Sequence, residues 1–247
     1  QAALDITSRV DELPKVLRRS QLFGGKRSSL RLGLIEDAAK AEWFQQSIAS
    51  ALFETQSLFP NVLVNLSEIG TADVAEFLQE DRLDLCLYVS HLIPSFPEEI
   101  ETHHLYTDHI CLVVSKQHPL NRPGVTAQEL LNAKDADFLL LDTNTGMQSQ
   151  MSHIFGALDV TPSIRYPHSK DLAMLQTYSG LGMFFYPKRM LSTNTPSAFI
   201  LDTYDLPTKN AELYFYACRK RGQDNAILDF FIQTLGRVCA SSEILNT

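Results

Sequence analysis

The stretch "HHLYTDH" (103–109) is the densest run of side chains that could bind a metal ion or move a proton. It carries the imidazoles of His103, His104 and His109, and the carboxyl group of Asp108. A zinc site needs such ligands to converge on one point. The neighbouring apolar residues predict a strand, on which His103 and His109 share a face while His104 points the other way. The ligands therefore do not converge, and we assign no metal to this stretch.

The usual signatures of catalysis are missing from the sequence. It contains no GxSxG elbow, no HExxH and no phosphate-binding GxxxxGK[ST]. The "GLG" at 180–182 precedes a strand instead of opening a helix, so it is no dinucleotide-binding loop. Acidic residues such as Asp142 and the pair Glu36-Asp37 have no recognisable catalytic partner. We therefore predict no enzyme activity and no cofactor, although some enzymes share the fold inferred below.

Charge and composition restrict the class of protein. The 247 residues are 45% hydrophobic and 20% charged, with a formal net charge of -8. This balance predicts a soluble protein that does not grip nucleic acid by itself. We find neither a membrane-spanning run nor a signal peptide, so we expect a cytoplasmic protein with no membrane partner. One basic stretch is interpreted as a solvated linker: Arg18, Arg19, Lys26, Arg27 and Arg31.

The four cysteines form no CxxC pair and have no zinc-finger spacing. Three of them, Cys86, Cys111 and Cys218, lie in apolar runs that resemble strands, and the fourth is Cys239. Such positions favour buried, reduced thiols over a redox switch, because reactive thiols need exposed and electropositive surroundings.

The first segment of the chain differs from the rest. Apolar residues at Ile6, Val10, Leu13 and Leu17 predict a helix with one apolar seam, which Pro14 should kink. We interpret residues 1–27 as a linker helix and connector. Because the sequence lacks an initiator Met, we read it as a fragment of something longer.

From residue 28 onward, strands alternate with helices. The first half shows strands at 30–35, 61–68 and 82–89, with helical segments between them. After a loop at 90–100 and a long extended stretch at 103–115, the alternation repeats. This order predicts mostly parallel sheets with helices on both faces. The later strands are expected at 137–141, 163–168, 183–186, 199–202 and 212–220, and the later helices near 126–132, 147–158, 169–179 and 227–238.

Two glycines punctuate the run "TYSGLGMFFYP" (177–187). Gly180 falls just after a helix, where a left-handed residue can end the helix without steric cost. Gly182 should let the next strand start close against that helix. Pro187 should stop the strand, because proline cannot donate to a ladder.

The alternation gives an α/β fold with two Rossmann-like subdomains and a cleft between them. We place subdomain I at 28–105 plus 219–247 and subdomain II at 106–218. In open α/β sheets a ligand binds beyond the carboxyl ends of the strands. The residues that should line such a site are Ile35, Glu36, Asp37, Ser67, Glu68, Gly70, Thr71, Tyr88, Thr143, Asn144, Thr145, His168, Ser169 and Phe184.

Several of these candidates have a structural alternative. Thr71 and Ser169 precede helices, whose first amides could hold an anion, or each could be a plain N-cap. Asn144 could bind a ligand or stabilise a turn. His168 could donate to a carboxylate and make binding pH-dependent, or it could bond a backbone carbonyl. Glu36 and Asp37 could bind a cationic group, and Asp37 could instead cap the following helix.

Five segments together resemble the effector-binding domain of LysR-type transcriptional regulators. They are "SSLRLGLIED", "SLFPNVLVNLSE", "GTADVAEFLQEDRLDLCLY", "DHICLVVSKQHPL" and "LAMLQTYSGLGMFFYPKRM". The resemblance runs from residue 28 to about residue 239. It is carried by the order and spacing of the segments, since each segment alone is a weak signal.

The resemblance implies a periplasmic-binding-protein-like (type 2) fold with a small-molecule effector in the cleft. It also implies a dimer or tetramer, and DNA binding through a winged helix-turn-helix domain that would precede residue 1. Pro14 and the acidic Glu36-Asp37 depart from the family's pattern, and the second departure disfavours an anionic effector. Two alternatives stay open, namely a solute-binding protein for transport and an enzyme on the same fold.

Overall fold

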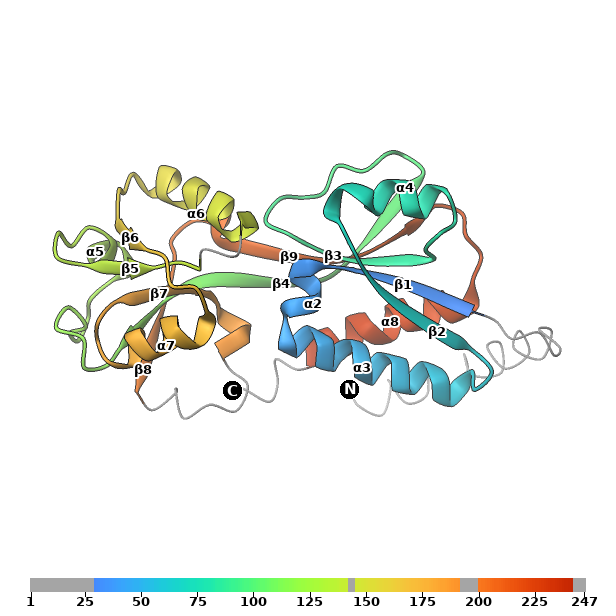
Figure 1. The fold of residues 1–247 in the computed structure, drawn as a ribbon, viewed down its shortest axis with the longest axis horizontal. Coiled ribbons are helices and arrows are strands. Elements are labelled where there is room, and N and C mark those ends of the chain that lie inside the picture. Colours follow the sequence, from blue (N-terminus) through green and yellow to red (C-terminus); the bar gives the residue numbers. More distant parts are fainter. Residues whose placement is uncertain (1–28, 142–144, 192–199, 242–247) are drawn as a thin grey trace. The chain divides into compact units, whose positions relative to one another are not determined.

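The computed structural model describes residues 29–141, 145–191 and 200–241, drawn as a ribbon in Figure 1. The helix expected within residues 1–20 lies outside these residues. The described chain forms two compact units. Unit 1 comprises residues 29–88, 95–106 and 216–241, and unit 2 comprises residues 89–94, 107–191 and 200–215. Each unit is described by itself below.

The sheet of unit 1 is centred on β1 (Ser29–Ile35). This strand runs parallel to both β2 (Leu63–Ile69) and β3 (Leu85–Ser90). The strand order is β2-β1-β3-β9-β4, where β9 is Glu212–Lys220 and β4 is Ile100–Ser115. β4 and β9 each contribute residues to both units.

Helices cover both faces of the sheet in unit 1. α3 (Glu42–Leu58) and α8 (Ala226–Ser241) lie side by side on one face, and α4 (Val74–Gln79) lies on the other (Figure 1). The inward sides of α3 and α8 are apolar and bury residues such as Phe44 and Phe231. Two short elements complete the unit, α2 (Glu36–Lys40) and the 3-10 turn η1 (Thr71–Asp73).

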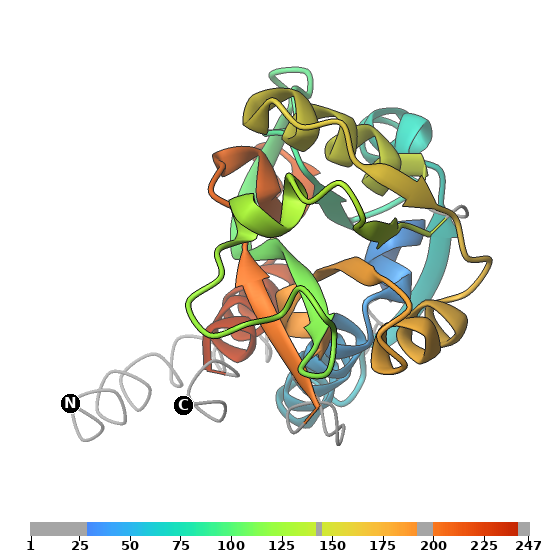
Figure 2. The same ribbon diagram turned by 90° about the vertical axis from the view of Figure 1, so that its left-hand side faces the viewer.

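Unit 2 repeats the parallel arrangement. β5 (Asp137–Leu139) lies between β6 (Ser163–Arg165) and β7 (Met183–Pro187) and is parallel to both. β4 adds to this sheet by antiparallel pairing with β7 and with β8 (Leu201–Asp205). Figure 2 shows α6 (Thr145–Leu158) and α7 (Lys170–Tyr178) on opposite sides of these strands. The shorter helices are α5 (Ala127–Leu131), η2 (Lys188–Leu191) and η4 (Lys209–Ala211).

The core of unit 2 follows the two-residue period of its strands. Ile110 and Leu112 of β4 pack on the side of α5 and α6, in one cluster with Phe138 and Phe185. Cys111 and its neighbours on the opposite face form a second cluster against α7. Alternating side chains of one strand therefore fill two separate layers.

The structure explains the two glycines of the "SGLG" run. Gly180 has a φ of 68° and its N–H donates to the Thr177 carbonyl at 3.0 Å, so it ends α7 as expected. The expectation for Gly182 is corrected. A Cβ there would lie 3.1 Å from Leu139 Cγ and 3.2 Å from the Asp137 carbonyl oxygen, so the close neighbour is β5 and not the preceding helix.

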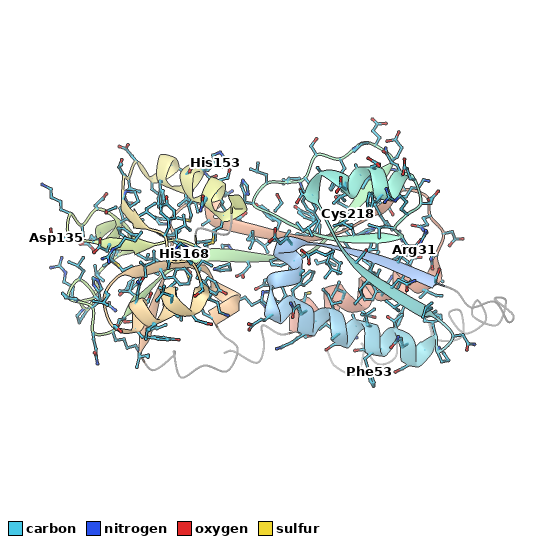
Figure 3. The ribbon with its side chains drawn as sticks, in the orientation of Figure 1. Arg31, Phe53, Asp135, His153, His168 and Cys218 are labelled. Atoms are coloured by element: carbon cyan, nitrogen blue, oxygen red, sulfur yellow. The ribbon has the colours of Figure 1, made fainter. Side chains whose placement is uncertain are left out.

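The structure tests the predictions for the cysteines and for Arg31. Cys86, Cys111 and Cys218 are buried and free, as predicted, and Cys239 is also buried. Arg31 is no part of a solvated linker, because it belongs to β1 and its Nη2 lies 2.7 Å from the Asp84 carboxylate (Figure 3). Within the described ranges, no helix has the length and apolar character that a membrane crossing requires.

Candidate functional site

The candidates of unit 1 meet at one edge of the sheet. Because β1 is parallel to its two neighbours, the carboxyl ends of the strands are aligned, with Ile35 opposite Ile69 and Leu34 opposite Leu87. The structure thereby brings together the residues that follow β1 and β2 with the end of β3. These candidates are Ile35, Glu36, Asp37, Ser67, Glu68, Gly70, Thr71 and Tyr88.

Accessibility divides this group. Ile35 is buried, with 2% of its surface exposed, so its side chain belongs to the core and cannot contact a ligand at the surface. Glu36, Glu68 and Thr71 are exposed and offer polar atoms to solvent. Ser67 is also exposed, but consecutive strand residues point to opposite faces, so Ser67 and Glu68 cannot both present side chains to one surface.

Neither proposed helix cap in unit 1 is present. The N-cap of η1 is Gly70, and no side chain caps it, so Thr71 is the first residue of the turn. The Asp73 N–H donates to the Gly70 carbonyl at 3.0 Å, which closes the turn through the backbone alone. The N-cap of α2 is Ile35, again without a side-chain bond, so Asp37 lies inside that helix and does not cap it.

Tyr88 is the aromatic member of the group and is half-buried in β3. Its ring lies edge-on to Phe96 with the centroids 5.3 Å apart. Burial raises the pKa of the Tyr88 phenol, and the neighbouring Cys218 and Cys86 raise it further. Tyr88 is therefore a neutral hydrogen-bonding group at neutral pH.

The candidates of unit 2 follow a second set of aligned strand ends. Leu139 of β5 is opposite both Arg165 of β6 and Phe184 of β7. Thr143 and Asn144 lie outside the described residues. Thr145 is the first residue of α6. Ser169 caps α7, since its Oγ accepts a hydrogen bond from the Leu172 N–H at 3.2 Å, which is the structural alternative expected for it.

His168 occupies a different element from the one predicted. β6 stops at Arg165, so His168 does not end a strand but lies in a bend directly before α7. The strand is shorter because Pro167 cannot donate to a ladder. His168 is exposed in this position (Figure 3), and its role in binding a ligand stays a prediction.

Phe184 has a different environment from the other candidates. Its side chain is fully buried, with 0% exposed, and its ring stacks on Tyr186 with the centroids 5.0 Å apart. It shares its cluster with Cys111, Val113 and Ala173. The structure therefore places the ring in the core of unit 2, and a role as the wall of a ligand site stays a prediction.

The side chains of "HHLYTDH" have separate partners. His103 Nε2 lies 3.4 Å from Glu101 Oε1, and the His104 ring lies 5.6 Å from that of Tyr216. Asp108 is 2% exposed and accepts the backbone N–H groups of His109 and Arg189. No three metal-ligating side chains gather anywhere in the described part of the chain.

Sequence reasoning missed what Asp108 does. Burial raises the pKa of its carboxyl group to about 6, although the two N–H groups and the charge of Arg189 act in the opposite direction. An acidic residue inside an apolar strand was the available signal, since such a group is rarely buried without hydrogen-bond partners.

Two α/β units with two strands common to both have the periplasmic-binding-protein-like (type 2) fold. The family described as LysR substrate binding domain matches residues 23–240. The chain therefore belongs to that family, whose members are the effector-sensing domains of LysR-type transcriptional regulators.

Solved structures agree with this assignment at the level of the fold. Full-length BenM is 20% identical with a TM-score of 0.67, and the match covers 98% of this chain and 77% of that chain. The BenM effector binding domain with its effector benzoate is 20% identical, with a TM-score of 0.65 over 87% and 94% of the two chains. The regulatory domain of MetR from N. meningitidis is 16% identical, with a TM-score of 0.65 over 88% and 96%. A search of curated protein sequences found no match.

Proposed function

We propose that this chain binds a small-molecule effector and passes the signal to DNA through a separate domain of the same regulator. The observation that carries the proposal is the family match over residues 23–240. The aligned strand ends of each unit support it, because they carry exposed polar groups where α/β folds bind ligands. An effector can act only by binding two arrangements of the protein with different affinity.

DNA would be read by a winged helix-turn-helix domain outside this sequence. The net charge of -8 supports this division, since a domain that grips phosphates is usually basic. A regulator must reach DNA to act, and we place the chain in the cytoplasm. We also propose that the chain is not an enzyme, since its sequence has none of the nucleophile, metal or phosphate motifs sought above.

Ligand binding can be tested by thermal unfolding with panels of small carboxylates, amino acids and amines. An effector at one hundred times its Kd should stabilise the fold by about 2.7 kcal/mol, because only the folded state binds it. His168→Gln and Glu68→Gln should reduce that shift. Lys134→Gln, at an exposed position outside the candidate set, serves as the control and should leave the shift unchanged.

Two further measurements separate the alternatives. The complete regulator should shift a specific DNA fragment in a gel, and the ligand found above should change that shift. Recovery of a chemically altered ligand would support an enzyme, and a secretion signal in the complete gene would support a transport protein. A complete protein that shifts no DNA sequence under any condition would contradict the proposal.

Self-association is part of the proposal, and exposed apolar side chains support it. On unit 1, Phe53 of α3 is 74% exposed and points away from the helix (Figure 3), and Leu63 and Leu66 of the edge strand β2 are each 55% exposed. On unit 2, Leu175 of α7 and Leu181 are each 60% exposed. Association of copies would bury this apolar area. We assign both groups of side chains to contacts between copies of the chain.

We expect the chain to sediment as a dimer or tetramer, and Phe53→Ser and Leu175→Gln each to weaken the association at least about tenfold. The reason is the loss of apolar area from the contact. Ile200→Ser removes an apolar side chain that is 42% exposed and lies in neither group, so it is the matched control. A wild-type chain that stays monomeric at high concentration would contradict the proposal.

A further inference from the structure

The end of β3 and the four residues after it group with a different unit from the residues on either side. Residues 89–94 group with unit 2, although Tyr88 before them and Ser95 after them belong to unit 1. Within this segment, Leu92 and Ile93 are 59% and 77% exposed. His91 is half-buried, and its ring lies 5.8 Å from the ring of His153 on α6, with the two planes 35° apart. The contact of two imidazoles thus joins the segment to unit 2.

The α6 side of this contact is firmly anchored. Asn210 Nδ2 donates to the His153 carbonyl at 3.3 Å. Gln150, one turn earlier on α6, is 2% exposed, and its Nε2 donates to the carbonyls of Asn210 and Glu212 at 3.1 and 2.9 Å. These bonds fix the helix that carries His153, whose own side chain is exposed, while His91 lies on a short connection that is covered only in part.

We propose that His91 and His153 form a proton-operated clasp, which holds residues 91–94 on α6 while at most one ring is charged and releases them when both are. Two imidazolium rings in ring contact repel each other, and the half-buried position of His91 screens that repulsion less than open water does. The clasp belongs to the pH range in which histidine changes charge.

The charges around the pair are consistent with this behaviour. Burial lowers the pKa of His91, and the charge of His153 lowers it further. The elements that anchor α6 carry Lys209 of η4 and Glu212 of β9, which have opposite charges. Within the ranges that the structure describes, no third histidine, cysteine or carboxylate joins the two rings to make a metal site.

The clasp gives the chain a sensitivity to pH that does not depend on the proposed effector. As pH falls through the titration of His91, residues 91–94 leave α6, and the exposed Leu92 and Ile93 move with them. The release requires no unfolding of α6, because Gln150 and Asn210 hold that helix independently of the rings.

Histidine-detected NMR on the whole chain tests the clasp between pH 5 and 8. We expect His91 to titrate below the ordinary histidine pKa of 6.5, and the methyl signals of Leu92 and Ile93 to change with the same midpoint. His153→Gln should raise the His91 midpoint and uncouple the methyl signals from it. His109→Gln, at an exposed histidine on β4, is the matched control and should change neither.

A second variant keeps the test meaningful if His153→Gln disturbs α6. His153→Phe retains an aromatic ring without a charge, so residues 91–94 should stay docked throughout. Limited proteolysis after Leu92 should accelerate at least about fivefold on acidification in the wild type and stay constant in His153→Phe. The inference is overturned if Leu92 and Ile93 ignore the His91 titration, or if His153→Phe is cleaved with the same pH dependence as the wild type.

Discussion

Replacing Phe184 by alanine should lower the free energy of unfolding by about 3 to 5 kcal/mol. The ring is fully buried on the α7 side of the unit 2 sheet, where it stacks on Tyr186 and packs against Ala173. Alanine would leave a cavity that neighbouring strands cannot collapse into, because β7 is paired on both sides. Urea unfolding followed by circular dichroism measures the change.

Two comparisons separate a core residue from a ligand-contacting one. Phe184→Leu keeps most of the apolar volume and should cost far less than alanine. Leu172→Ala removes a side chain that is 41% exposed and should change the stability by roughly 0.5 kcal/mol or less. If Phe184→Ala keeps wild-type stability and loses only ligand binding, the ring is a wall of the site and our placement in the core is wrong.

Asp108 should contribute a loss of stability as pH rises from about 4 to about 6. Burial raises the pKa of this carboxyl group from 3.8 to about 6 in the folded protein, so the folded state holds its proton more tightly than the unfolded chain. The favourable contribution is full below the unfolded pKa and is lost as pH passes the folded pKa. The shift corresponds to roughly 3 kcal/mol.

Asp108→Asn is the direct test, because an asparagine can still accept the N–H groups of His109 and Arg189 but carries no ionisable group. Unfolding free energies measured at several values between pH 4 and pH 7 should rise more steeply with pH, or fall less, in the variant than in the wild type. Asp135→Asn, at an exposed carboxylate, should keep the wild-type slope. Equal slopes in Asp108→Asn and the wild type would refute the assignment.

The elements of the fold were largely predictable, because their causes are local. The apolar run at 30–35 and the helix end at Gly180 follow from period and backbone geometry, and both are found in place. The neighbours of Arg31 and Gly182 were not predictable. Arg31 meets Asp84, 53 residues away, and Gly182 meets β5, so both outcomes depend on how distant strands pair.

The candidate site was also predictable from the sequence only in part. The alignment of strand ends follows from parallel pairing, which the alternation of elements already indicated. The helix caps could not be predicted in this way. Thr71 and Asp37 each lie one or two residues inside the element that they were expected to cap. Element boundaries depend on the tertiary environment of each end, which a single sequence does not contain. The contact between His91 and His153 could not be predicted either, because the two residues lie on segments that are far apart in the sequence.

The discontinuous make-up of unit 1 has a consequence for biosynthesis. Its sheet needs β9 and its helical layer needs α8, and both come from the last segment of the described chain. Nearly all of unit 2 is one stretch, residues 107–215. On a ribosome, where domains tend to fold as they emerge, the middle of the chain can become compact while the strands β2, β1 and β3 still lack β9 and α8. Until translation delivers these elements, β3 has an unpaired edge, which is open to chaperones and to aggregation.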